Sequence, residues 1–125
     1  MDKDSFYKSL FADNQEIMLL INPETFRIED CNTAACRFYG YSYEEILQYR
    51  ITDFNTLPDD MVINEIRLAR GQKRRLFYSR HRLANGQVRD VEVRSTPVTI
   101  EDREFLLSII TDTTESRRPD SGENF

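Results

Sequence analysis

The sequence predicts an α+β domain in which short helices pack on one face of an antiparallel sheet. Two stretches of alternating apolar and polar residues meet at Asn85-Gly86, a dipeptide typical of a tight turn between paired strands. Two short apolar stretches precede residue 32, and a longer one, residues 103–111, follows the hairpin. Helical segments occupy the region between them, so the predicted order is two strands, several short helices and three strands.

Length and composition indicate one globular domain. The chain has 125 residues, 39% apolar and 31% charged, which is enough to bury a single core. No apolar run approaches the roughly eighteen residues of a membrane span, and the chain does not begin with a signal-peptide pattern. The two cysteines, Cys31 and Cys36, form no disulfide scaffold and complete no metal site, so we expect a reduced, cytoplasmic protein without a bound metal.

The charge of the chain argues against nucleic-acid binding, because the net charge is −5 at pH 7. One basic cluster could nevertheless form a phosphate or RNA patch, and it consists of Lys73, Arg74, Arg75, Arg80 and Arg82. We favour a second interpretation, in which these side chains lie on the exposed face of the hairpin and Asp90 and Glu92 supply the opposite charge across the strands.

The N-terminal third is predicted to contain a helix and two strands. Residues 4–13 form the helix, capped by Asp4 or Ser5, and residues 17–21 and 26–31 form the strands. We divide the chain into an N-terminal cap helix (1–13), a main domain (14–116) and a polar linker or tail (117–125).

Local capping signals predict the helices that follow. Asn32 caps a helix over residues 33–39, which Gly40 ends, and Ser42 with Glu45 forms a capping box for residues 43–47. Another turn is predicted at residues 52–54. A longer helix begins at Pro58, ends at Gly71 and should face the sheet with Val62, Ile66 and Ala69.

The register of the hairpin follows from its charge pattern. Each strand has one row without charged side chains: Phe77, Ser79, His81 and Leu83 on the first, and Val91, Val93, Ser95 and Pro97 on the second. These rows share a face only if the numbers of paired residues sum to an even number. A two-residue turn gives an odd sum, so we predict a three-residue loop, Ala84-Asn85-Gly86, with a left-handed Gly86. His81 then points into the core.

The last strand is apolar on both faces and should therefore be central or covered on both sides. Its inward side chains are expected to be Leu106, Ser108 and Ile110. Its outward side chains, Phe105, Leu107 and Ile109, would form a patch that monomers seldom leave bare. We expect the N-terminal helix to cover this patch, or a homodimer to use both surfaces, through Phe6, Leu10 and Phe11.

Three motifs together resemble the PAS domain, a small sensor module of signalling proteins. Residues 30–46 contain Asn32, a short helix, a Gly-Tyr-Ser stretch and a Glu-Glu pair. The hairpin carries Arg-His-Arg at residues 80–82 and the Asn-Gly turn. Residues 112–115, Asp-Thr-Thr-Glu, are similar to the signature that ends the domain before its effector.

This resemblance implies a PAS fold, in which a five-stranded antiparallel sheet of order 2-1-5-4-3 carries short helices on one face. We expect the N-terminal helix on the other face. Members of the family bind a small molecule, a haem or a flavin, or have no known ligand, and they commonly dimerise. The Arg-His-Arg and Asn-Gly hairpin resembles modules that precede GGDEF-type diguanylate cyclases and histidine kinases in bacteria.

Two departures from the family disfavour a haem and a photoactive flavin, and the cofactor stays unknown. Photosensing relatives carry a reactive cysteine in the stretch that corresponds to residues 50–54, which here has none. Haem-binding relatives use a histidine on the long helix before the hairpin, and residues 58–70 contain none.

A ligand pocket, if present, is expected between the sheet and the long helix, lined by Ile28, Ala35, Val62, Ile66, His81, Val91, Val93 and Ser108. His81, the only histidine, either bonds a ligand or senses pH, or is a structural side chain bonded to backbone or to Asp90. The small hydroxyls of Ser79, Ser95 and Ser108 either orient a ligand or leave room for helix side chains.

No catalytic constellation is present in the sequence, so we do not expect the module itself to be an enzyme. We expect a sensory module that binds a small ligand or relays a conformational change to a covalently linked effector domain. Asp112 and Thr114 are the expected transmission residues, since they lie where the chain leaves the last strand. The alternative is a ligand-free domain whose role is dimerisation.

Overall fold

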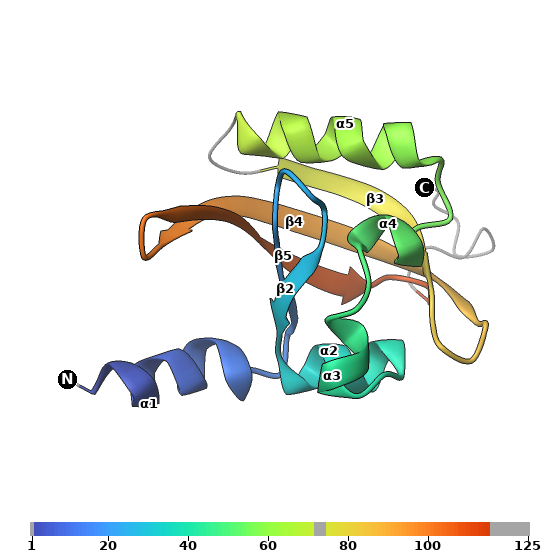
Figure 1. Ribbon diagram of the computed structural model, residues 1–125. Coiled ribbons are helices and arrows are strands. Elements are labelled where there is room, and N and C mark those ends of the chain that lie inside the picture. The colour runs from blue at the N-terminus through green and yellow to red at the C-terminus, as the bar shows by residue number, and fades with distance from the viewer. Residues whose placement is uncertain (1, 72–74, 116–125) are drawn as a thin grey trace.

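The computed structural model describes residues 2–71 and 75–115, so Lys73, Arg74 and the predicted linker at 117–125 lie outside the described residues. Five antiparallel strands form one sheet in the order β2-β1-β5-β4-β3, as predicted (Figure 1). The strands are β1 (Ile17–Ile21), β2 (Ile28–Cys31), β3 (Arg75–Arg82), β4 (Val88–Ile100) and β5 (Arg103–Asp112). The apolar β5 is the central strand because it pairs with both β1 and β4.

Four helices lie on the inner face of the sheet. They are α2 (Thr33–Tyr39), α3 (Tyr43–Ile46), α4 (Ile51–Phe54) and α5 (Asp59–Arg70). Helix α5 packs against β3 and β4, and α2 packs against β1 (Figure 1). The sheet-facing side chains predicted for α5, Val62, Ile66 and Ala69, are all buried. Among the described residues no helix is long and apolar enough to cross a membrane.

The predicted caps set the bounds of these helices. The Asn32 side chain accepts a hydrogen bond from the backbone N–H of Ala35, and Gly40 ends α2 in a left-handed conformation with φ +85°. Ser42 and Glu45 form the reciprocal capping box of α3. A side-chain oxygen satisfies a backbone donor that the first helical turn leaves without a partner, so short helices begin at defined residues.

The hairpin has the predicted register. Phe77 pairs with Val93 and Ser79 with Val91, so the paired numbers sum to an even number. The loop is Ala84-Asn85-Gly86, closed by a hydrogen bond of 2.8 Å from the Leu83 N–H to the Gln87 carbonyl. Gly86 has φ +89°, the left-handed conformation that the bulge requires.

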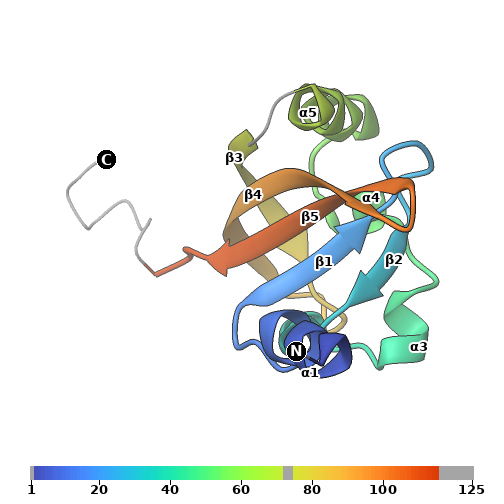
Figure 2. The same cartoon turned by 90° about the vertical axis from the view of Figure 1, so that its left-hand side faces the viewer.

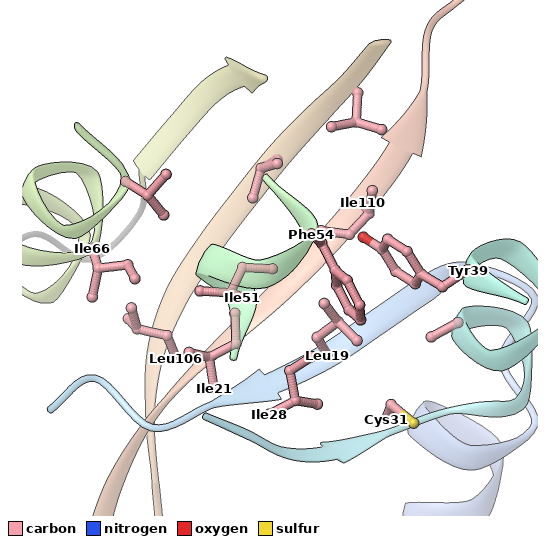
Figure 3. Close-up of a cluster of buried hydrophobic side chains, with 14 of the residues drawn as sticks. Leu19, Ile21, Ile28, Cys31, Tyr39, Ile51, Phe54, Ile66, Leu106 and Ile110 are labelled. Carbon is pink, nitrogen blue, oxygen red and sulfur yellow. The ribbon is translucent and has the colours of Figure 1, made fainter. Parts of the chain in front are cut away.

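Aromatic rings fill the space between α2, α4 and the sheet. The ring of Tyr39 stacks on that of Phe54 with 4.5 Å between centroids, and the rings of Tyr41 and Tyr49 also contact Phe54. Figure 3 shows Tyr39 and Phe54 side by side above Leu19 and near Ile110. Both Tyr39 and Phe54 are almost completely buried, so this core is dense rather than hollow.

The N-terminal segment corrects one prediction. It consists of α1 (Lys3–Tyr7), capped by Asp2, and a π-helical segment η1 (Lys8–Ala12). These helices project beyond the lower end of the sheet and leave its outer face open (Figure 2). Phe6 and Leu10 are each 52% exposed, and only Phe11 of the predicted stripe is buried. The predicted packing of Phe6 and Leu10 on the outer face is therefore wrong for the single chain.

The carboxylate of Asp30, rather than the predicted apolar stripe, determines the direction of the N-terminal helices. Asp30 on β2 accepts hydrogen bonds from the hydroxyls of Tyr7 on α1 and Tyr43 on α3. On the outer face, Phe105 is buried nevertheless, and the Arg103 guanidinium lies 4.9 Å above its ring centroid. Leu107 and Ile109 remain half-buried.

Glycine substitutions test the two left-handed turns. An alanine Cβ at Gly86 meets nothing within 4 Å, whereas one at Gly40 lies 3.2 Å from the Ala84 Cβ. We expect Gly86→Ala to lower the free energy of unfolding by about 1 kcal/mol, from backbone strain alone. Gly40→Ala should cost about 2–3 kcal/mol because overpacking is added. Gly71→Ala, at an ordinary negative φ, is the control and should change stability by less than about 0.5 kcal/mol in urea unfolding. Equal losses at Gly40 and Gly86 would contradict the close approach of α2 to the hairpin.

Candidate functional site

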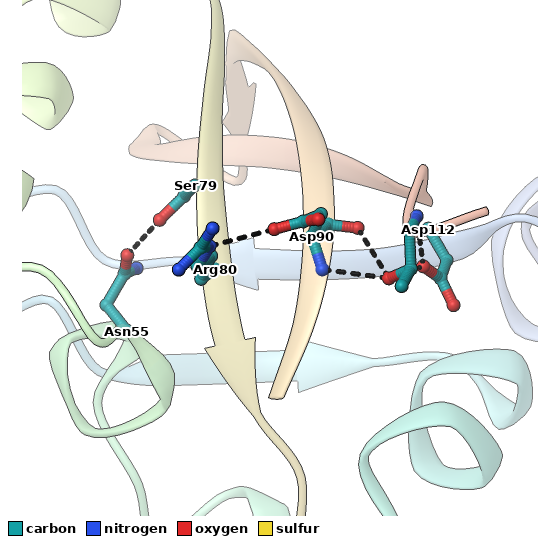
Figure 4. Close-up of polar contacts among 6 residues, drawn as sticks. Asn55, Ser79, Arg80, Asp90 and Asp112 are labelled. Atoms are coloured by element: carbon teal, nitrogen blue, oxygen red, sulfur yellow. Dashed lines mark hydrogen bonds and ion pairs between the residues drawn. The ribbon is translucent and has the colours of Figure 1, made fainter. Parts of the chain in front are cut away.

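A chain of polar side chains crosses the core between α2 and β3. His81 on β3 is 1% exposed and hydrogen-bonds with both ring nitrogens. Its Nδ1 lies 2.8 Å from the Tyr39 hydroxyl, and its Nε2 lies 3.2 Å from Nδ2 of Asn55. The Ser79 hydroxyl donates in turn to Oδ1 of Asn55, as Figure 4 shows. The four residues form one connected buried network.

Backbone contacts bring these side chains together. The loop after α4 runs along β3, with a bridge between Asn55 and His81 and a hydrogen bond of 3.0 Å from the Thr56 N–H to the Arg80 carbonyl. The end of α2 is joined to the hairpin loop, because the Ala84 N–H donates to the Tyr39 carbonyl over 2.8 Å. Tyr39 and Asn55 are thereby held on opposite sides of the imidazole.

The donors and acceptors determine how the ring is protonated. An amide nitrogen can only donate, so Nδ2 of Asn55 donates to Nε2 of His81. The ring proton is then on Nδ1 and donates to the Tyr39 oxygen. Burial lowers the pKa of His81 to about 4 and raises the pKa of Tyr39, because a charge on either group would be poorly solvated. Both groups are neutral at neutral pH.

The cavity beside this network is almost completely filled. It has a volume of about 10 Å³, close to the lower limit for a single water molecule. Five of the eight predicted pocket residues line it, namely Val62, Ile66, His81, Val93 and Ser108. The other three, Ile28, Ala35 and Val91, are buried in the apolar core away from the cavity. The ligand pocket stays a prediction.

Asn55, which no sequence pattern indicated, completes the polar lining together with Ser95, one of the hydroxyls expected at the pocket. Ser95 and Ser108 share a hydrogen bond of 2.8 Å across β4 and β5. Asn55 follows a four-residue helix without any local motif, so its role depends on a contact 26 residues away. His81 bonds neither Asp90 nor backbone through its ring: Asp90 faces outward and pairs with Arg80 at 2.9 Å.

A second polar cluster holds the end of β5, where Asp112 and Thr114 were predicted to transmit a signal. The Asp112 carboxylate accepts bonds from the Thr114 N–H at 3.0 Å and from its hydroxyl at 2.7 Å, and Arg89 pairs with it at 2.8 Å. The N–H of Asp90 donates to the Thr114 hydroxyl over 2.9 Å (Figure 4). Partial burial acts to raise the pKa of Asp112, but the bonds from Thr114 and Arg89 lower it on balance. These contacts hold the residues that follow β5 against the beginning of β4.

The described residues hold no group of three or more His, Cys, Asp or Glu side chains placed to bind a metal ion. The candidate site consists of a closed, neutral polar network between the helices and the sheet and an ionic contact at the end of β5. The first joins helices to the sheet, and the second joins the sheet to the following chain.

Comparison with known proteins identifies the class to which this architecture belongs. Residues 15–115 match the family model of the PAS domain, so the chain belongs to the PAS domain family. PAS domains are sensor modules of signalling proteins and are not themselves catalytic.

Individual relatives place the chain within that family. The chain is 34% identical over 119 residues, 93% of its length, to the diguanylate cyclase DgcM of Escherichia coli strain K12, and it spans 29% of that protein. A PAS domain from a two-component sensor histidine kinase has a TM-score of 0.75 and 21% identity, with 88% of this chain and 96% of that chain covered. The PAS domain of an HTR-like protein from Haloarcula marismortui has a TM-score of 0.77 and 22% identity, with 88% and 91% covered.

The buried histidine predicts a pH dependence of stability. Its pKa in the folded state, about 4, lies below its ordinary value of 6.5, so the unfolded chain binds more protons between these limits. The contribution of His81 to the free energy of unfolding is therefore fully present above about pH 6.5, and it is lost as the pH falls towards 4. We expect urea unfolding to show a loss of about 2 kcal/mol between pH 7 and pH 5, where carboxylates contribute little. The loss should be absent in His81→Gln, and the same loss in that variant would refute the assignment to His81.

Proposed function

We propose that this PAS domain is a conformational relay whose core is filled by its own side chains. The observation that carries the proposal is that the cavity beside His81 has a volume of only about 10 Å³. Tyr39, stacked on Phe54 and hydrogen-bonded to His81, fills the neighbouring space between helices and sheet. A rigid core of this kind moves as a unit, because packed interiors have few alternative arrangements. Changes in helix packing then reach the sheet through the Tyr39–His81 contact.

The contacts at the end of β5 support the proposal that a conformational change leaves the sheet along this strand. Asp112 and Thr114 join the chain that leaves β5 to Arg89 and Asp90 on β4, so a shift between these strands alters the start of the linker. We propose that a covalently linked effector domain follows, a diguanylate cyclase or a histidine kinase. The likeness to DgcM favours the diguanylate cyclase, of which this chain would be the regulatory part.

A second candidate function is binding of a small ligand after the core has expanded. The observation that favours it is the set of polar groups at the cavity, from Asn55, His81, Ser95 and Ser108, among apolar neighbours. A saturable thermal shift with one metabolite of a library would support this function, and the filled core supports the relay. In either case we propose a cytoplasmic location, which suits the free thiols of Cys31 and Cys36.

Homodimerisation is the remaining part of the proposal. The outer face of the sheet presents Leu107 and Ile109 on β5. Leu76 and Tyr78 on β3, which are 41% and 52% exposed, lie on the same face beyond the charged Glu92 and Arg94 of β4. Phe6 and Leu10 on the N-terminal segment add two half-exposed apolar side chains. We propose that two copies bury these surfaces against each other, next to the exit at Asp112.

Asp112→Asn tests the exit. It weakens the ionic contact with Arg89, so amide exchange at Thr113 and Thr114 should become about tenfold faster or more, while β1 remains protected. In the full-length protein the same substitution should change the output of the effector domain. Asp60→Asn, on the exposed first turn of α5, is the control and should change neither quantity. Faster exchange with unchanged effector output would contradict the proposed route.

Leu107→Glu tests the dimer, since it places a charge in the outer face without disturbing the inner core. Light scattering should show a dimer for the unchanged chain and a monomer for this variant at the same concentration. Leu68→Glu is the matched control, because Leu68 is 39% exposed on α5 and lies on the opposite side of the domain. A monomeric unchanged chain, or equal dissociation by both substitutions, would refute the proposed interface.

A further inference from the structure

The two cysteines meet where β2 ends and α2 begins. The sulfur atoms of Cys31 and Cys36 are 3.7 Å apart, both thiols are free, and no other cysteine is present in the sequence. We propose that this pair is a modification site, at which a hydroperoxide converts the two thiols into an intramolecular disulfide.

The local backbone holds the sulfurs close to bonding distance. Asn32, between the two cysteines, caps α2 through its Oδ1 and donates from Nδ2 to the carbonyls of Asn14 and Glu16, at 3.2 and 2.7 Å. This anchor fixes the angle between strand and helix and so the separation of the side chains. A disulfide has an S–S length of about 2.05 Å, so the sulfurs must approach by less than about 2 Å, within the range of side-chain rotation.

A groove gives an oxidant access to the pair. It has a volume of about 570 Å³ and is lined by Tyr7, Phe11, Asp30 and Tyr43, which come from α1, η1, β2 and α3. Both cysteines are among its lining residues. Cys36 is partly exposed there, and Cys31 is 4% exposed. Access therefore favours reaction at Cys36 first.

The reaction balances with one hydroperoxide as the oxidant. The Cys36 thiolate attacks the terminal hydroxyl oxygen of the hydroperoxide, the O–O bond breaks, and the other oxygen leaves as hydroxide or alkoxide with the electron pair. The product is a sulfenic acid at Cys36. Cys31 loses its proton and attacks the sulfenic sulfur, the S–O bond breaks, and the hydroxyl leaves as water. Two thiols have then lost two electrons to the peroxide. Burial, together with Cys36 and Asp30, raises the pKa of Cys31, so this thiol is little ionised and is not the one that attacks the peroxide first.

Peptide mass spectrometry tests the proposal on the unchanged chain. Arg27 and Arg37 flank the pair, so trypsin releases both cysteines in one peptide, residues 28–37. After hydrogen peroxide and then N-ethylmaleimide, this peptide should carry no maleimide and be lighter than the reduced peptide by two hydrogen atoms. Dithiothreitol should restore two maleimide-reactive thiols.

Two variants separate the proposed steps. Cys31→Ser should leave Cys36 able to form a sulfenic acid that dimedone traps, with no disulfide inside the peptide. Cys36→Ser should leave Cys31 as a maleimide-reactive thiol after the same treatment. Oxidation of Cys36 to sulfinic acid in the unchanged chain while Cys31 remains a thiol would overturn the proposal, and so would a disulfide that joins two chains.

Discussion

The register of the β3–β4 hairpin determines which side chains of these strands enter the core. Side chains alternate between the two faces of a strand, so a shift of one residue would move Phe77, Ser79 and His81 to the outer face and bring charged residues into the core. The three-residue loop with left-handed Gly86 prevents this shift. The same loop receives the end of α2, through the bond from Ala84 to the Tyr39 carbonyl. One turn therefore sets both the inner face of the sheet and the helix packed against it.

The buried hydrogen-bond network around His81 closes the core that this register forms. A neutral imidazole between Tyr39 and Asn55 has all its hydrogen-bonding capacity used, so it needs neither solvent nor a ligand to be satisfied. Its neighbours are stacked aromatic rings that leave almost no volume. A domain with such a core is suited to transmit movement between its helices and β5, and the ionic contacts of Asp112 provide the place where movement can leave the sheet.

Local chemistry explains what could be predicted from the sequence. The Asn32 cap, the Ser42–Glu45 capping box and the Asn85-Gly86 turn involve residues close in the chain, so their residue types specify the backbone directly. The polar network joins segments 42 and 26 residues apart, and nothing in the sequence near Tyr39 or Asn55 points to His81 as the partner. The N-terminal helix was misplaced for a related reason. An apolar stripe indicates that a surface should be buried, but it does not identify what buries it. Here the hydrogen bond from the Tyr7 hydroxyl to Asp30 determines where the helix lies.

His81 is a neutral side chain whose two ring nitrogens are both hydrogen-bonded inside a closed core. Long-range proton–nitrogen NMR of the imidazole tests this most directly, because the sequence contains a single histidine and the ring signals need no further assignment. We expect one neutral tautomer at pH 7, with the proton on Nδ1 and Nε2 accepting a hydrogen bond. The same tautomer should persist at pH 5.5, because burial lowers the pKa of His81 to about 4. An imidazolium at pH 5.5, or averaged signals from two tautomers in exchange with solvent, would show that the core is open around His81 and would contradict this account.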